Sequence, residues 1–363
     1  GASNAYFARI VTSILIPPFS QKLFRILESP EFHRWLAVSG TQDGEVPDLI
    51  WDEAEKYFRV PKTDLIAAHK SKQAEQKELE SHEVTEEAFR YAEYEAFNGK
   101  DLGGTQDELR LRQSDISDCC DAFQQTIDSV VLVDKLVETR CLTGFTRLDP
   151  NSKIASLSRA RQNWLPAIAG TGEGIFLRLN NARLKEWSQM PDVQKRVATI
   201  RQRASDYGLA NRRSGNGVTP EFVLIHTLAH SLNRRLSFDC GYGSSSIRER
   251  VYCGDDPKMA GLLIYTSEAG NEGTLGGLVV MGEPEVLEKT LIDALNDSAF
   301  CSNDPLCEES SGQGPGSVNL AACQGCCLVP ETSCEEGNFF LDRVLLIGTA
   351  DNPSLGYFSA FLK

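Results

Sequence analysis

The stretch CSNDPLCEESSGQGPGSVNLAACQGCCLVPETSC, residues 301–334, holds six of the eleven cysteines in a chain of 363 residues. Cys323 and Cys326 form a C-x2-C pair, in which a tight turn brings two thiolates onto one edge of a tetrahedron. Cys301 and Cys307 offer a second, wider pair. Four thiolates are the ligand set of a structural zinc ion, and we expect this site to decide how the end of the chain folds.

The residues between the pairs fit this interpretation. Asp304 and Pro305 favour a turn that folds the wider pair back, and the Gly- and Ser-rich segment 310–317 is flexible enough to let the pairs meet. Cys327 and Cys334 are surplus to a four-ligand site, although Cys334 could replace one of the four. No histidine lies in the stretch, so a closed structural site is favoured over a catalytic one. The alternative is a set of reduced or disulfide-bonded cysteines.

The overall composition is that of a folded globular protein. Hydrophobic residues make up 41% and charged residues 24% of the sequence, which argues against disorder over most of the chain. No apolar run is long enough for a membrane span, and no signal peptide is recognisable, so we expect a cytoplasmic protein whose cysteines stay reduced. The sequence begins at Gly1, and we treat it as a piece of something longer.

The net charge of −14 is unevenly distributed. Residues 75–122 hold fourteen acidic and five basic side chains, whereas residues 151–238 hold five acidic and fourteen basic ones. A basic middle could contact a nucleic-acid backbone without reading its sequence. The candidate contacts are Arg234, Arg235, Arg248 and Arg250. The alternative is a solvated face, or a surface that pairs with the acidic segment.

Composition and periodicity predict an α+β fold in three regions. Residues 1–125 are expected to be largely helical with an acidic arm, residues 126–217 to mix strands and helices on a basic background, and residues 218–363 to form an α+β zinc-binding domain.

Individual elements of the last two regions can also be predicted. β-branched clusters predict strands at 129–148, 172–179 and 260–267, and a further strand is expected at LVVMG, residues 278–282. Thr219 and Pro220 have the residue types that begin a helix, here expected over 220–238. The Gly-rich segments 170–174 and 270–277 are interpreted as turns. Neither carries the Lys-Ser/Thr of a P-loop, so the sequence contains no ATPase signature.

His226 and His230 are four residues apart on the predicted helix, a spacing at which two imidazoles can hold one metal. A zinc protease of the HExxH kind needs a glutamate after the first histidine, and here that residue is Thr227. Histidines that pack in the core are therefore favoured. A metal or phosphate role, as in a zinc-dependent hydrolase or nuclease, stays open.

Three long segments together resemble the zinc-binding domain that closes MrfA-type DNA repair helicases. They are HTLAHSLNRRLSFDCGYGSSSIRERVY (226–252), AGLLIYTSEAGNEGTLGGLV (260–279) and the cysteine stretch with its sequel EEGN..LDRVLLIG. Most of the chain is also similar to the DrmB family, the helicase-associated subunits of the DISARM anti-phage system. That likeness includes GASNAYFARIVTSILIPP (1–18), GFTRL (144–148) and WLPAIAGTGEGIFLRL (164–179).

This resemblance implies ligands, a packing motif and partners. The metal ligands would be Cys301, Cys307, Cys323 and Cys326, with Cys334 as an alternative because the helicase versions hold the first two cysteines closer together. The packing motif after the cluster would be Asn338, Leu341, Asp342 and Arg343. The partners would be a superfamily 2 helicase like DrmA, which would hydrolyse ATP, and phage DNA.

The expected function is a non-catalytic subunit whose structural zinc domain helps the helicase to engage DNA. The alternatives are a zinc-dependent hydrolase or nuclease that uses His226 and His230, and a free-standing DNA-binding module.

Overall fold

The structure is a computed structural model that describes residues 6–16, 21–39, 46–81, 86–99, 108–147, 153–160, 162–209, 217–255, 258–267 and 276–362. The chain divides into two compact units. The larger consists of Gly1–Thr12 and Leu111–Lys363, and the smaller of Ser13–Arg110. Helices and an antiparallel sheet make it an α+β protein, as the sequence predicts. In the part that is described, no helix combines the length and apolar character needed to span a membrane.

The smaller unit is helical, as expected. Its helices are α1 (Gln21–Leu27), α2 (Pro30–Ser39), α3 (Asp48–Phe58), α4 (Lys62–Ser81) and α5 (Glu86–Asn98). Leu23, Phe32, Trp51 and Leu65 bring α1 to α4 together around one apolar core. In α5, the buried carboxylate of Glu93 accepts the backbone N–H of Ile14 at 2.9 Å. The helix that carries much of the predicted acidic arm therefore has a buried side as well as a solvated one.

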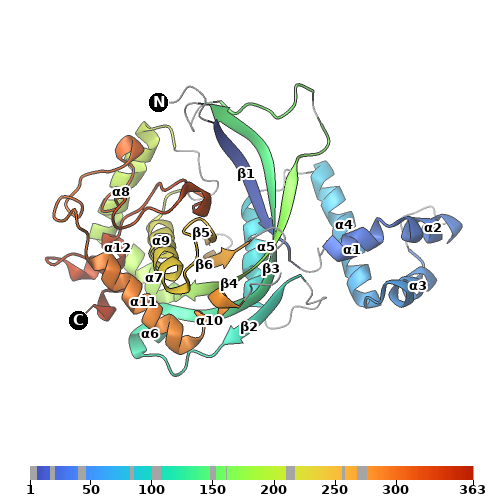
Figure 1. The fold of residues 1–363 in the computed structure, drawn as a ribbon, viewed down its shortest axis with the longest axis horizontal. Coiled ribbons are helices and arrows are strands. Elements are labelled where there is room, and N and C mark those ends of the chain that lie inside the picture. The colour runs from blue at the N-terminus through green and yellow to red at the C-terminus, as the bar shows by residue number, and fades with distance from the viewer. Residues whose placement is uncertain are drawn as a thin grey trace. The chain divides into compact units, whose positions relative to one another are not determined.

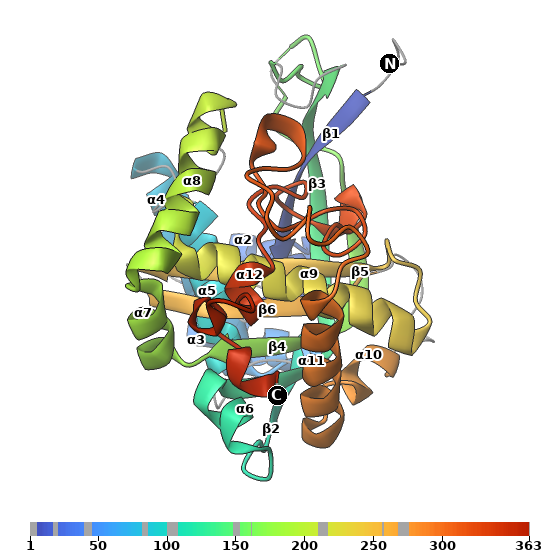
Figure 2. The same ribbon diagram turned by 90° about the vertical axis from the view of Figure 1, so that its left-hand side faces the viewer.

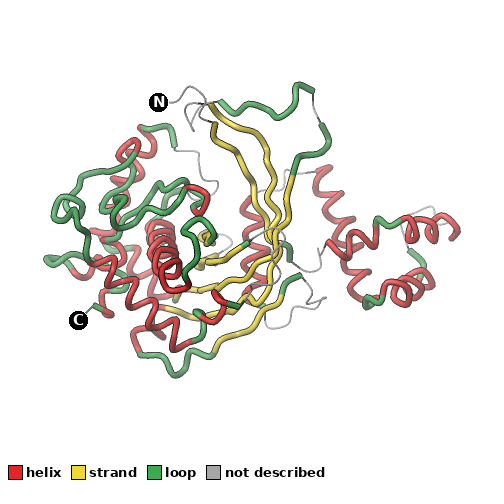
Figure 3. Tube along the Cα trace, viewed as in Figure 1, coloured by secondary structure: helices red, strands yellow, loops and turns green. Residues whose placement is uncertain are grey.

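A curled sheet forms the centre of the larger unit (Figure 3). Its strands are β1 (Tyr6–Ile14), β2 (Arg110–Ser114), β3 (Ile127–Arg147), β4 (Ala167–Leu179), β5 (Ile247–Asp255) and β6 (Lys258–Thr266). The order is β1-β3-β4-β6-β5, and β2 also pairs with β3. β3 and β4 are antiparallel, as are β4 with β6 and β5 with β6.

The strands predicted at 129–148, 172–179 and 260–267 are confirmed as parts of β3, β4 and β6. The turn predicted at 170–174 is wrong, because these residues continue β4. Their glycines serve close approach instead: a Cβ on Gly172 would lie 1.6 Å from the carbonyl oxygen of Thr266. The Gly-rich pattern thus marks a close approach of the paired strands β4 and β6 rather than a chain reversal.

The helices of the larger unit lie mainly between and after the strands. They are α6 (Asp121–Thr126), α7 (Asn181–Ser188), α8 (Pro191–Asp206), α9 (Pro220–Cys240), α10 (Gly277–Val280), α11 (Pro284–Ala299) and α12 (Val344–Ile347), with 3-10 turns η1 (Pro315–Ser317), η2 (Glu331–Ser333), η3 (Pro353–Leu355) and η4 (Ser359–Phe361). Figures 1 and 2 show α9 lying along β5 and β6, with α11 crossing beside it.

Helix α9 begins as its sequence predicts and ends two residues beyond the expected position. The hydroxyl of Thr219 accepts the backbone N–H of Phe222 at 3.2 Å, Pro220 occupies the first turn, and Gly241 ends the helix at φ +68°. Its residues from Phe222 to Asn233 are all buried, because the sheet lies on one side and α11, α12 and the cysteine stretch cover the rest. A helix buried all round presents polar side chains to the interior only where they have a partner.

Further elements differ from expectation. The strand expected at LVVMG is wrong, since Gly277–Val280 is the helix α10, whose Leu278 N–H bonds to the Glu173 carboxylate at 2.8 Å. Strands β1 and β2 lie in a region expected to be largely helical, and β5 was not among the predicted strands. The loop expected at 270–277 lies mostly outside the described residues. The division at 125 and 217 stays a prediction about separable domains, and strands from both sides of residue 217 share the sheet.

Candidate metal centre

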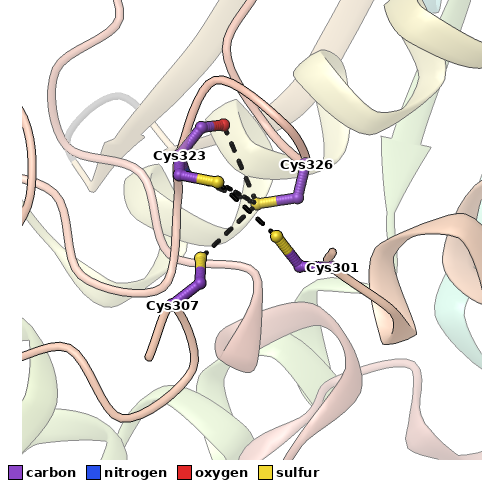
Figure 4. Close-up of side chains that lie close together, drawn as sticks. All are labelled: Cys301, Cys307, Cys323 and Cys326. Atoms are coloured by element: carbon purple, nitrogen blue, oxygen red, sulfur yellow. Dashed lines mark hydrogen bonds between the residues drawn. The ribbon is translucent and has the colours of Figure 1, made fainter. Parts of the chain in front are cut away.

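Four cysteine sulfur atoms converge at one point of the larger unit. Cys301 Sγ lies 3.5 Å from Cys323 Sγ, and Cys326 Sγ lies 3.8 Å from both Cys307 Sγ and Cys323 Sγ. All four sulfur atoms lie within 4.8 Å of one another. Figure 4 shows the side chains pointing inward from two separate segments of chain.

These separations match a tetrahedral zinc site. With Zn–S bonds of about 2.3 Å, the edges of a tetrahedron of thiolates are about 3.8 Å long. A disulfide would need sulfur atoms about 2.05 Å apart, and all the chain's cysteines are free. Cys301 and Cys307 are buried and Cys323 and Cys326 half-buried, so an ion held by all four thiolates would have no open position. The residues present therefore fit a closed zinc site.

The C-x2-C turn is shaped by its own backbone. The N–H groups of Cys326 and Cys327 donate to the carbonyl of Cys323, at 3.2 and 2.9 Å. In return, the N–H of Cys323 points at Cys326 Sγ from 3.3 Å. Backbone donors aimed at sulfur stabilise the thiolate form that a metal requires.

The wider pair is closed by Asp304, as its turn-forming sequence predicts. Its carboxylate accepts the backbone N–H groups of Cys301 at 2.9 Å and Glu308 at 3.1 Å. The same carboxylate pairs with the guanidinium of Arg343, which also donates to the carbonyl of Ser298 at 2.8 Å. Arg343 thus ties the first cysteine loop to the end of α11.

Two side-chain amides that the sequence did not single out also approach the sulfur atoms. Asn303 Nδ2 lies 3.3 Å from Cys323 Sγ, and Gln313 Nε2 lies 3.3 Å from Cys307 Sγ. Burial raises the pKa of Cys323, but hydrogen bonds from Asn303 and Cys301 outweigh it and lower that pKa to about 6. Burial raises the pKa of Cys326. The only sequence signal for these amides is that each lies near a candidate ligand.

The residues after the cluster pack against it. Asp342 is fully buried, pairs with Arg196 of α8 and accepts the backbone N–H groups of Ala321 at 3.3 Å and Val344 at 3.2 Å. Asn338 bridges the backbone N–H and carbonyl of Val329 at 2.9 and 2.8 Å. These contacts hold the returning chain against the second cysteine pair.

The two surplus cysteines lie elsewhere. Burial raises the pKa of Cys327 to about 12, and its carbonyl oxygen faces His230 Nδ1 at 2.9 Å. Cys334 lies apart from the four thiols, with His226 Nε2 3.2 Å from its sulfur. His226 and His230 are both fully buried, and the carboxylate beside them is Glu249 of β5 rather than a residue of their own helix.

The four candidate arginines do not form one surface. Arg250 is 2% exposed and pairs with Glu335 at 2.8 Å. Arg235 contacts the carboxylates of Asp239, Asp293 and Asp297, and Arg234 donates to the carbonyls of Gly325 and Leu328 beside the C-x2-C turn. Arg248 is half-buried, and within the described part of the chain its guanidinium has no ion-pair partner.

Comparison with known proteins agrees with this geometry. The family described as the MrfA Zn-binding domain matches residues 228–327, a span that contains the four converging cysteines. The whole chain is 31% identical, over an alignment of 391 residues, to a curated DISARM protein DrmB from Bacillus paralicheniformis. The chain spans 66% of the length of that relative. Taken with the α+β fold and its cysteine-rich end, this similarity shows that the chain belongs to the DrmB family of DISARM proteins and carries an MrfA-type zinc-binding domain.

Proposed function

We propose that the chain is a non-catalytic, helicase-associated component of a bacterial DISARM-like complex that acts against phage in the cytoplasm. Its structural zinc, held by Cys301, Cys307, Cys323 and Cys326, would stabilise a domain that supports a superfamily 2 helicase on DNA. The helicase would be DrmA-like and would hydrolyse the ATP. Membership of the DrmB family supports the assignment to this kind of complex.

The observation that carries the proposal is the closed set of four thiols. An ion with four protein ligands offers no position for a reacting water, so the centre stabilises the fold instead of catalysing a reaction. The sequence also has no P-loop lysine to hold a nucleotide phosphate. A folded domain without either kind of catalytic centre is suited to serve as a scaffold for an enzyme that has one.

Association with the helicase tests the proposal. We would co-express the chain with a superfamily 2 helicase encoded beside it, purify through a tag on the helicase and measure the ratio of the two chains. Cys323→Ser should reduce recovery of the chain strongly, whereas Cys120→Ser, at an exposed cysteine outside the cluster, should not. Absence of any complex with wild-type chain, or equal recovery of both variants, would contradict the proposal.

Contact with DNA is the second part of the proposal, and Arg248 is its cleanest test. Reversal at Arg250 would place a second carboxylate against Glu335, and reversal at Arg235 would place four carboxylates together, so either variant would strain the fold as well as any DNA contact. Arg248→Glu disturbs neither pair. It should weaken DNA binding by the complex, and binding should fall about tenfold or more from low to moderate salt.

The matched control is Arg110→Glu, which makes the same change in net charge at an exposed arginine inside the acidic segment 75–122. A gel-shift titration at two salt concentrations compares the two variants. Equal weakening by both would mean that only net charge matters, and no weakening by Arg248→Glu would remove this residue from the DNA-contacting surface.

A hydrolase or nuclease is the second candidate, because Glu249 places a carboxylate beside His226 and His230. All three side chains are buried, however, and substrate would have no path to them without local opening. DNA cleavage or hydrolysis that survives exhaustive purification and disappears in His226→Ala would favour this candidate over the scaffold.

A further inference from the structure

A second group of metal-binding side chains lies in the interior of the larger unit. It consists of His226 and His230 on α9, Glu249 on β5 and Cys334, which follows η2. One ligand atom from each of the four lies within 4.8 Å of the others. His226 and Cys334 fall outside residues 228–327, the span matched by the zinc-binding family.

The separations inside this group are short. His226 Nε2 lies 3.0 Å from Glu249 Oε1 and 3.2 Å from Cys334 Sγ, and His230 Nε2 lies 3.3 Å from the same carboxylate oxygen. A tetrahedral zinc ion with bonds of about 2.0 to 2.3 Å separates its ligand atoms by about 3.3 to 3.8 Å. A small expansion of the group would therefore accommodate the ion.

A hydrogen bond to the backbone fixes the tautomer of His230. Its Nδ1 lies 2.9 Å from the carbonyl oxygen of Cys327, and a carbonyl can only accept, so Nδ1 carries a proton. In the neutral ring the Nε2 lone pair then points into the group. This Nε2 has no hydrogen-bond partner within the described part of the chain, and neither does Glu249 Oε2. A metal ion would satisfy both atoms, and the carbonyl that fixes the ring is the usual outer support of a ligating histidine.

One backbone donor approaches the sulfur of Cys334. The backbone N–H of Asn338 lies 3.2 Å from its sulfur, and Asn338 is itself fixed by two hydrogen bonds to Val329. All four side chains are at most 6% exposed. One carboxylate and one thiolate would balance the two charges of a zinc ion, so the loaded group is neutral and costs little to bury.

We propose that His226, His230, Glu249 and Cys334 form a second zinc site, distinct from the four-cysteine centre. Two imidazoles, one carboxylate and one thiolate are all common zinc ligands, and together they fill a tetrahedron. The site joins α9, β5 and the chain after η2, which no other described cluster of ligands brings together. Because no position is left for water, its role is structural.

The two centres share a backbone link. Cys326 is a ligand of the first centre, and the carbonyl of the next residue, Cys327, orients His230 of the second. Loading of the first centre fixes the turn that carries this carbonyl. Zinc binding at the first centre should therefore favour binding at the second.

The competing account is a buried ion pair between a protonated histidine and Glu249. It would place a proton where the metal is proposed and would give one zinc per chain rather than two. Zinc content therefore separates the two accounts, and this test does not depend on the proposed function.

The first experiment counts zinc by mass spectrometry in the intact purified chain. Wild type and Cys120→Ser should hold two zinc ions per chain, and Glu249→Gln, which keeps the shape of the side chain but removes its charge, should hold one. One zinc ion in wild type after supplementation with zinc would overturn the proposal, as would two ions retained in Glu249→Gln.

The second experiment uses wild type alone, so it decides the question even if the variants do not fold. Replacing zinc with cobalt should give two sets of absorption bands: one of a four-thiolate ion, and one at higher energy with weak sulfur charge transfer, as expected for a single thiolate with nitrogen and oxygen ligands. X-ray absorption spectroscopy at the zinc edge should correspondingly report five sulfur and three nitrogen or oxygen ligands, summed over the two ions. A pure four-thiolate spectrum in both measurements would contradict the second site.

Discussion

At the scale of single residues, buried charges hold the cysteine loops in place. Arg343 is 1% exposed, and its guanidinium reaches both the carboxylate of Asp304 in the first loop and the carbonyl of Ser298 at the end of α11. The carboxylate of Asp342, next to it, pairs with Arg196 and accepts the backbone N–H of Ala321, just before the second cysteine pair. The candidate metal ligands are thus positioned by residues outside the ligand set.

Arg343→Met should be strongly destabilising. The substitution keeps much of the side-chain volume but leaves Asp304 without its cation, and breaking a buried pair in this way costs about 3 to 5 kcal/mol. Denaturant unfolding of the zinc-loaded chain measures the loss. Arg110→Met, at an exposed arginine, is the control and should change stability by less than about 0.5 kcal/mol. A loss as small as that in Arg343→Met would mean that the loop does not depend on this pair.

Cys323→Ser should remove zinc from the four-cysteine centre and unfold or aggregate the region around it. Metal binding to such thiolates contributes on the order of 10 kcal/mol to folding. Zinc content and the soluble fraction are measured together, with Cys120→Ser as the control. Soluble, normally folded Cys323→Ser that retains all of its zinc would exclude Cys323 as a ligand.

At this scale, the sequence predicts what is close along the chain. The short spacing of Cys323 and Cys326 indicates a metal-binding turn, and the structure brings their sulfur atoms together with those of Cys301 and Cys307. Glu249 and Cys334 could not be joined to His226 in this way, because they are 23 and 108 residues away from it. The packing of β5 against α9 brings Glu249 beside His226, and the packing of η2 against β5 brings Cys334 there.

At the scale of elements, local signals were reliable where local contacts decide. Thr219 and Pro220 begin α9 in the predicted way, and the helix runs two residues past its predicted end at 238. The strand predicted at residues 278–282 was wrong. The long-range hydrogen bond from the Leu278 N–H to Glu173 favours the helix α10, despite the β propensity of these residues. Strand β5 was missed because Arg248, Glu249 and Arg250 resemble a solvated loop, although Glu249 and Arg250 are buried beside partners from other elements.

The close approach of β4 and β6 gives a prediction at this scale. Gly172→Ala should destabilise the sheet by about 3 kcal/mol or more, because the added methyl would overlap the Thr266 carbonyl and the strands would have to separate. Gly243→Ala is the control, since its nearest neighbour would be Ser246 Oγ at 3.5 Å. Thermal unfolding compares the two variants, and equal stability would show that the strands can move apart without cost.

At the scale of the whole molecule, the candidate metal centres and the sheet belong to the larger unit, and the smaller unit has its own apolar core. Composition and periodicity predicted the α+β class and a largely helical region over 1–125, in which the structure has α1 to α5. They did not predict that β1 belongs to the sheet, because that pairing joins residues more than a hundred positions apart.

The isolated chain should neither hydrolyse ATP nor cut DNA. Its sequence has no phosphate-binding loop with a lysine. Each of its two candidate metal sites has four protein ligands, which leaves no position on an ion for a reacting water. Phosphate release and cleavage of labelled DNA are measured on the purified chain, alone and with the helicase. ATP hydrolysis should be found only when the helicase is present. Activity of the chain alone that disappears in His226→Ala would instead identify an enzyme.

Hydrogen exchange of the whole chain, with zinc bound and after its removal by a chelator, tests most directly that zinc organises the larger unit. We predict that residues 301–346 and α9 lose protection when zinc is removed, while α3 in the smaller unit keeps its protection and serves as an internal reference. Unchanged exchange over 301–346, or an equal loss in α3, would contradict this account.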